Sequence, residues 1–160
     1  MTTSLIIPEL VTVIAVKNQN PQSLTPEFLK GSGTVPADWE LASQPICTAS
    51  GSQVTFANGI SIVAEPQRIM FMEAIDGKAD KEILMPTIAS KYVQTLPYME
   101  YQAIGHNLRG FAPFDTHKDA ARKYINETLF SQGAWQEVGT APMRATINLA
   151  YTLERCMFYW

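Results

Sequence analysis

The sequence predicts an α+β fold, a two-layer sandwich in which a mostly antiparallel sheet of about six strands packs against two main helices, in the order β-α-βββ-α-β-α-β. Several short runs alternate apolar and polar residues, as strands with one buried face do, and two longer runs repeat apolar residues at helical spacing. The connections around "ANG" and "EPQR" are too short for a crossover helix, which favours antiparallel neighbours.

The chain has 160 residues, which suggests a single domain over 1–160 that can bury a core without a metal or a disulfide. Only 17% of the residues are charged, below the usual share of about 25%, so less polar surface is available to face water. The C-terminal "ERCMFYW" is apolar where chain ends are usually polar. Either this end packs on another surface, or the domain continues beyond it.

The composition argues against several classes of protein. The net charge is −3 and the basic residues are scattered singly, so no nucleic-acid partner is expected. No run reaches the roughly 18–20 apolar residues that span a bilayer, and the N-terminus lacks a basic export signal, so we expect a cytoplasmic protein with no membrane partner. Cys47 and Cys156 form no CxxC-type motif, and the two histidines form no ligand set, so neither a metal nor a cofactor is expected.

The clearest local signal is a β-hairpin around Asn58 and Gly59. A two-residue loop would leave neither face of the hairpin apolar. A three-residue loop over 57–59, a type I turn followed by a glycine bulge, places Phe56 opposite Ile60 and Val54 opposite Ile62 on one face. Because a slip of one residue moves every side chain to the other face, the apolar pattern selects the three-residue loop.

The next turn leaves a second apolar face on the sheet. If Glu65 pairs with Arg68 across this turn, Ile69 and Phe71 join the inward face. Three residues then lie on the opposite side of the sheet: Val63, Met70 and Met72. Either helices or loops of the same chain cover them, or they form an interface with a partner, for which adaptable methionine is well suited.

The remaining elements follow from apolar spacing and from caps. The residues of 10–16 are apolar and β-branched, as in an interior strand, and Thr25 caps a short helix that begins at Pro26. A helix within 80–97 buries Ile88 and Tyr92, and a strand over 98–111 follows it.

The C-terminal third predicts one more helix and one more strand. Thr116 and Asp119 resemble a capping box, and the helix after them is expected to bury one apolar side: Ala121, Tyr124, Ile125, Thr128 and Leu129. Residues 143–153 alternate cleanly and predict the last strand. Two strand–helix–strand passages in this part of the chain favour some parallel pairing.

The strongest candidate for chemistry is the segment "GHNLRGFAPFDTH". Its polar residues are His106, Asn107, Arg109, Asp115 and His117. A histidine is suited to act as a general base, and an arginine is suited to hold an anion. Alternation, however, places His106 on the opposite face from Asn107 and Arg109, while polar residues at a helix entrance are common caps. We therefore assign no catalytic residue.

Two functional hypotheses remain. The first is a non-catalytic assembly domain that forms a homo-oligomer or docks on a protein partner through the apolar sheet face and the aromatic C-terminus, including Phe158 and Trp160. The second is a binding protein for a small anionic ligand, or a small enzyme, with a cleft around Arg109, His106, Asp115 and His117. The sequence favours the first.

Overall fold

A computed structural model describes residues 6–114, 119–141 and 143–148. The chain divides into two compact units, and the division falls between Ala112 and Pro113.

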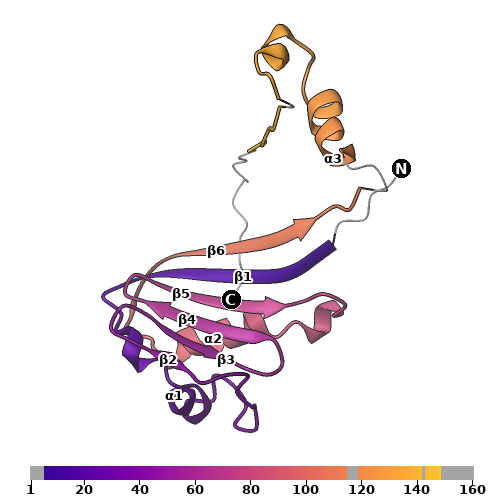
Figure 1. Cartoon of the computed structure of the whole chain (residues 1–160). Coiled ribbons are helices and arrows are strands. Elements are labelled where there is room, and N and C mark those ends of the chain that lie inside the picture. Colours follow the sequence, from indigo (N-terminus) through magenta and orange to yellow (C-terminus); the bar gives the residue numbers. More distant parts are fainter. Residues whose placement is uncertain (1–5, 115–118, 142, 149–160) are drawn as a thin grey trace, which may run out of the picture. The chain divides into compact units, whose positions relative to one another are not determined.

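The first unit contains a six-stranded sheet in the order β2-β3-β4-β5-β1-β6 (Figure 1). The strands are β1 (Ile6–Lys17), β2 (Ile46–Cys47), β3 (Ser52–Thr55), β4 (Ile60–Glu65), β5 (Arg68–Ala74) and β6 (Glu100–Phe111). The predicted α+β class is confirmed, and β1 is the interior strand that its apolar run predicts. Every pair of neighbouring strands in the described sheet is antiparallel, so the predicted parallel pairing is wrong here.

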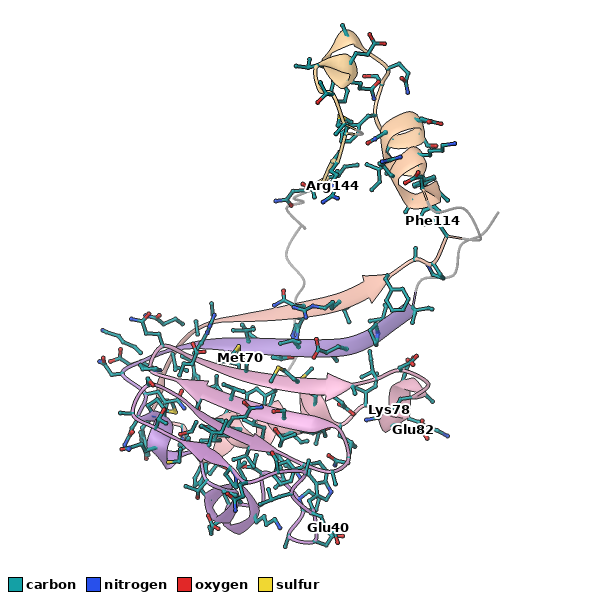
Figure 2. All side chains as sticks on the ribbon, viewed as in Figure 1. Glu40, Met70, Lys78, Glu82, Phe114 and Arg144 are labelled. Carbon is teal, nitrogen blue, oxygen red and sulfur yellow. The ribbon has the colours of Figure 1, made fainter. Side chains whose placement is uncertain are left out.

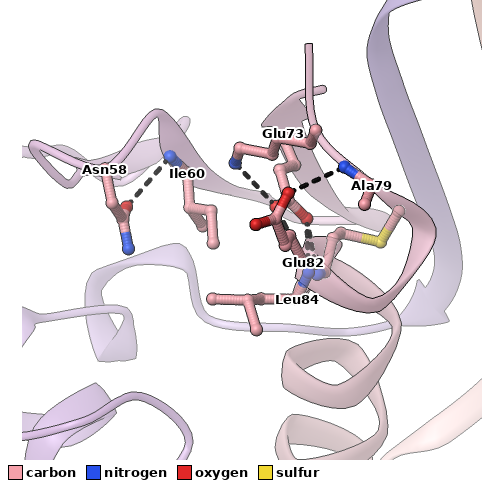
Figure 3. A network of polar contacts seen from close by, with 8 residues as sticks. Asn58, Ile60, Glu73, Ala79, Glu82 and Leu84 are labelled. Atoms are coloured by element: carbon pink, nitrogen blue, oxygen red, sulfur yellow. Dashed lines mark hydrogen bonds and ion pairs between the residues drawn. The ribbon is translucent and has the colours of Figure 1, made fainter. Parts of the chain in front are cut away.

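The hairpin between β3 and β4 has the three-residue loop. The Phe56 backbone N–H donates to the Ile60 carbonyl at 2.8 Å, and Gly59 has a φ of 85°, in the left-handed region that glycine tolerates. Asn58 adds a local bond, because its side-chain oxygen accepts from the Ile60 N–H at 3.2 Å (Figure 3). Phe56 and Ile60 are both buried on one face, as the apolar pattern predicts.

One face of the sheet carries the core of this unit. Helices α1 (Pro26–Gly31) and α2 (Met85–Thr95) lie on this side (Figure 1). The unit also contains the short 3₁₀ helices η1 (Pro21–Ser23) and η2 (Asp80–Glu82). Tyr92 of α2 packs edge-on against Phe71 of β5 at 5.4 Å between ring centroids, and Phe28 of α1 packs against Tyr92 at 6.1 Å. Thr25 caps α1 as predicted, since its hydroxyl accepts from the Phe28 N–H at 3.1 Å.

The second unit differs from its prediction. It contains α3 (Ala120–Lys123), the π-helical turn η3 (Tyr124–Leu129) and the 3₁₀ turn η4 (Ala134–Glu137). Asp119 makes no side-chain cap, and Thr116 lies outside the described residues. The side predicted to be buried is largely exposed, including Tyr124 and Leu129, because no described element of this unit covers it.

The strand predicted over 143–153 is also wrong over residues 143–148, which have no regular secondary structure. Its remaining residues lie outside the described part. Alternation describes how a strand is buried, but a strand forms only where another strand offers its hydrogen-bonding edge. The sixth strand of the sheet is instead β2, only two residues long, which sequence patterning did not detect.

Across the described ranges, no helix has both the length and the apolar character needed to cross a membrane.

Candidate functional site

The structure does not gather the residues of the predicted polar cluster. In the register of β1 and β6, His106 lies opposite Thr12 and Asn107 lies opposite Val11, so the two side chains are on opposite faces, as alternation predicts. His106 Nδ1 forms a hydrogen bond with the Thr12 hydroxyl at 2.8 Å. Asp115 and His117 lie outside the described residues.

Arg109 shares a face with Asn107 but lies in open solvent. Its side chain is 82% exposed, and its guanidinium is 3.8 Å from a carboxylate oxygen of Glu9 on the neighbouring strand. An exposed pair at this distance contributes little to stability or to anion binding. The predicted residues that the structure describes therefore form no converging site.

Glu73 on β5 is the centre of a buried polar network that the sequence analysis missed (Figure 3). Its carboxylate is fully buried and accepts from Lys78 Nζ at 2.9 Å, from the Leu84 N–H at 2.9 Å and from the Met85 N–H at 2.7 Å. These two amides stand at the start of α2, where helical N–H groups lack partners and a negative charge is favourable.

A signal for this network exists in the sequence. Glu73 continues the alternation of Ile69 and Phe71, which places a carboxylate in phase with the apolar face. A buried carboxylate needs partners, and free N–H groups of a following helix are natural ones. With all its contacts inside the fold and no exposed atom, Glu73 holds α2 on the sheet and offers no access to a ligand.

The predicted interface residues lie together on the other face of the sheet, with Val11 and Val13 of β1 beside them. Met70 lies opposite both Val63 and Val13, and Met72 lies opposite Val11 (Met70 is labelled in Figure 2). All of these side chains are half-buried. Because α1 and α2 both lie on the opposite face, no described helix of this unit covers this apolar surface. Phe158 and Trp160 lie outside the described residues.

The edge strand β6 exposes large apolar side chains. Ile104, Leu108 and Phe111 are 62%, 63% and 54% exposed. β6 is twelve residues long and pairs with β1 along one edge, and no strand within the described ranges pairs with its other edge. Such an edge offers a row of unpaired backbone N–H and C=O groups.

Two grooves flank the loop of residues 17–20 that follows β1. The larger one has a volume of about 660 Å³ and is also lined by Pro66, Gln67 and Gln102. The smaller one, of about 370 Å³, is bordered by Leu96, Tyr98, Met99 and Glu100. Both volumes lie in the range of small-molecule sites, which is roughly 300–1,000 Å³.

One residue of this loop, Gln19, is buried and bonds to a tyrosine of α2. Gln19 is 8% exposed, and its Nε2 donates to the Tyr92 hydroxyl at 3.4 Å. Burial raises the pKa of Tyr92, nearby Tyr101 raises it further, and the bond from Gln19 opposes the shift. Tyr92 is therefore a neutral hydroxyl at physiological pH and supplies no charge to the grooves.

The arrangement of acidic, histidine and cysteine side chains also bears on metal binding. Among the described residues, no group of three or more His, Cys, Asp or Glu side chains is placed to hold a metal ion. No protein-family model, curated protein or solved structure is significantly similar to this chain.

Proposed function

We propose that this chain is a non-catalytic assembly domain that self-associates, and that the contact is formed by the outer edge of β6 from two copies. The observation that carries the proposal is the twelve-residue edge strand on which Ile104, Leu108 and Phe111 are each more than half exposed. Addition of a strand to this edge would satisfy its backbone groups and cover these side chains.

β6 lacks two residue types that usually protect an edge, although its pairing with β1 has a register shift near each end, between Tyr101 and Ala103 and between Arg109 and Phe111. It contains no proline and no lysine. Its two charged residues are paired with the neighbouring strand, since Glu100 bonds Lys17 at 3.2 Å and Arg109 is 3.8 Å from Glu9. An approaching strand therefore meets little uncompensated charge, and apolar contact can decide the outcome.

A second copy fits this edge better than an arbitrary strand, because β6 is self-complementary. Two antiparallel copies of β6 can be related by a two-fold axis perpendicular to the sheet, which keeps each face of the sheet on the same side in both copies. Residues that lie opposite each other across the contact then point to the same face, so their sequence numbers differ by an even number. Centring the pair on His106 uses residues 103–109, over which the register with β1 is regular, and places Ile104 opposite Leu108 twice. Centring it on Gly105 would place Ile104 opposite His106, which is a poorer apolar match.

In this arrangement the faces opposite α1 and α2 in the two copies form one continuous surface. Val63, Met70 and Met72 of each copy then share one side of it, and we assign them to a wider apolar interface of the assembly.

An anionic-ligand function has less support, because Arg109 is largely exposed and lies on the opposite face from His106.

We place the chain in the cytoplasm, because Cys47 is a free and exposed thiol and free thiols persist in reducing compartments.

The register can be tested by a disulfide across the symmetry axis. In a chain with Cys47→Ser and Cys156→Ser, His106→Cys would place two cysteines directly opposite each other, within bonding range. Mild oxidation is expected to give a covalent species of twice the 17.8 kDa chain mass. Asn107→Cys is the matched control, because its two copies would be offset by two positions and out of range.

Solution mass supplies the second arm of this test. The native chain is expected to be a dimer at micromolar concentration, and Ile104→Lys with Leu108→Lys is expected to make it monomeric while leaving its circular dichroism spectrum unchanged. A monomeric native chain would contradict the proposal. Equal crosslinking of the His106→Cys and Asn107→Cys chains would contradict the register and the edge pairing together.

A further inference from the structure

The two grooves beside the loop of residues 17–20 show a consistent chemistry, and only two of their lining residues, Glu100 and Gln102, belong to the strand of the proposed self-association. We infer that they bind a neutral, hydroxyl-rich ligand of the saccharide class, with Tyr98 as the aromatic surface on which a sugar ring stacks.

The lining of the grooves is polar but carries little net charge. Five carboxamide side chains contribute to it: Asn18, Gln19, Asn20, Gln67 and Gln102. The charged residues of the lining, Lys17 and Glu100, pair with each other at 3.2 Å. A phosphate or carboxylate ligand would have to compete with this pair, whereas a neutral ligand leaves it intact.

Carboxamides match hydroxyl groups in hydrogen-bonding capacity. Each carboxamide offers two N–H donors and one carbonyl acceptor, and each sugar hydroxyl both donates and accepts. Asn18, Gln67 and Gln102 line the larger groove and are exposed, so their carboxamides are accessible to a ligand. Asn20 is partly engaged, since its side-chain oxygen accepts from the Gln22 N–H at 3.1 Å.

Gln19 is a buried residue of the loop whose hydrogen bonding is incomplete. It lines both grooves, is more than nine-tenths buried, and its Oε1 has no hydrogen-bond partner in the part of the chain that the structure describes. Native proteins rarely leave a buried acceptor without a partner. This oxygen has almost no accessible surface, so an enclosed water between it and a bound ligand, and not the ligand itself, is the partner that would complete its bonding.

Tyr98 supplies the apolar part of the site. Its side chain borders the smaller groove and is 98% exposed, an unusual position for an aromatic ring that packs on no other ring among residues 6–114. Leu96 and Met99 border the same groove. The C–H groups of a pyranose ring pack on an exposed aromatic ring, while its hydroxyls point toward the carboxamides.

The loop is held in place before any ligand arrives. The Gln19 N–H donates to the Pro66 carbonyl at 3.1 Å, and the Val16 N–H donates to the Gln67 carbonyl at 3.0 Å. Asn18 adopts a φ of 58°, a left-handed conformation that asparagine tolerates better than most residues. A loop anchored in this way loses little further freedom when it binds, which favours affinity.

The experiment uses the full-length chain and named neutral trisaccharides as probes: maltotriose, cellotriose, triacetylchitotriose and mannotriose. Chemical-shift changes in amide NMR spectra report binding at millimolar probe concentration. At least one trisaccharide is expected to shift the amides of residues 17–20, and Tyr98→Ala is expected to weaken that binding by about tenfold, equivalent to about 1.4 kcal/mol. Gln102→Ala is expected to weaken it by a smaller factor.

Tyr124→Ala is the matched control, because Tyr124 is an exposed tyrosine that lines neither groove. It is expected to leave the affinity unchanged. Failure of all four probes to shift residues 17–20 would overturn the inference, as would equal weakening by Tyr98→Ala and Tyr124→Ala. Shifts caused by adenosine monophosphate and not by the sugars would replace the saccharide with a nucleotide. The Ile104→Lys and Leu108→Lys chain is expected to retain the binding, which separates this site from the assembly contact.

Discussion

Strands β5 and β6 pair with the two edges of the same strand, β1, and both place an isoleucine opposite Ile14. Ile69 on β5 is fully buried, whereas Ile104 on β6 is 62% exposed, although the two side chains point to the same face of the sheet. The difference lies above the sheet, since α2 packs on β5 and β1. Burial of a strand residue therefore depends on the layer that covers it as much as on its phase.

The largest loss of stability is expected where α2 covers β5. Glu73→Ala would leave Lys78 and two N–H groups of α2 without their buried partner, and removal of one member of a buried charged network costs about 3–5 kcal/mol. The free energy of unfolding from urea titration measures this loss. Glu82→Gln is the control, because Glu82 is exposed and its carboxylate accepts one N–H bond, from Ala79, so a loss below about 1 kcal/mol is expected. Equal losses in the two variants would show that Glu73 does not hold α2.

The isoleucine pair tests the comparison directly. Ile69→Ala empties space in the core beneath α2, and it is expected to cost about 2–5 kcal/mol of unfolding free energy. Ile104→Ala, measured at a concentration where the chain is monomeric, is expected to change stability by no more than about 0.5 kcal/mol. If Ile104→Ala costs as much as Ile69→Ala under these conditions, another part of the chain covers β6.

A smaller effect is expected at the turn that sets the register of the covered face. Gly59→Ala forces a side chain into a φ of 85° and brings its Cβ to 3.4 Å from the Cβ of Ala74, so a loss of about 1–2 kcal/mol is expected. Gly31→Ala is the matched control, because a Cβ there meets no atom within 4 Å and alanine is favoured in a helix. Denaturant midpoints of the two variants should move in opposite directions, and a neutral Gly59→Ala would contradict the bulged turn.

Local patterns predicted much of the first unit. The positions of Phe56 and Ile60 follow from a glycine-containing turn, and the pairing of Arg68 with Glu65 follows from the proline turn between them; the register confirms both. Thr25 and Pro26 similarly predicted the start of α1. These features succeed because their causes are turn geometry, steric limits and hydrogen bonds between residues close together in the chain.

The same patterns gave wrong predictions where the structure of a segment depends on contacts with residues far away in the sequence. Residues 143–148 alternate as a strand but form none, Ile46–Cys47 becomes a strand with little pattern, and the expected buried side of the helix after Asp119 is exposed. The candidate site follows the same rule. His106, Asn107 and Arg109 are adjacent in sequence but separate across the sheet, while the grooves join residues 17–20 to Gln67, Tyr98 and Gln102.

By itself, the sequence determined the α+β class, the hairpin register and the inward phase of the strands, because these depend on steric and hydrogen-bonding rules that act over a few residues. Only the tertiary structure decided that β6 stands at the edge, that Glu73 meets the start of α2 and that the loop after β1 borders two grooves. Each of these depends on which distant surfaces come together, and that choice belongs to the whole chain.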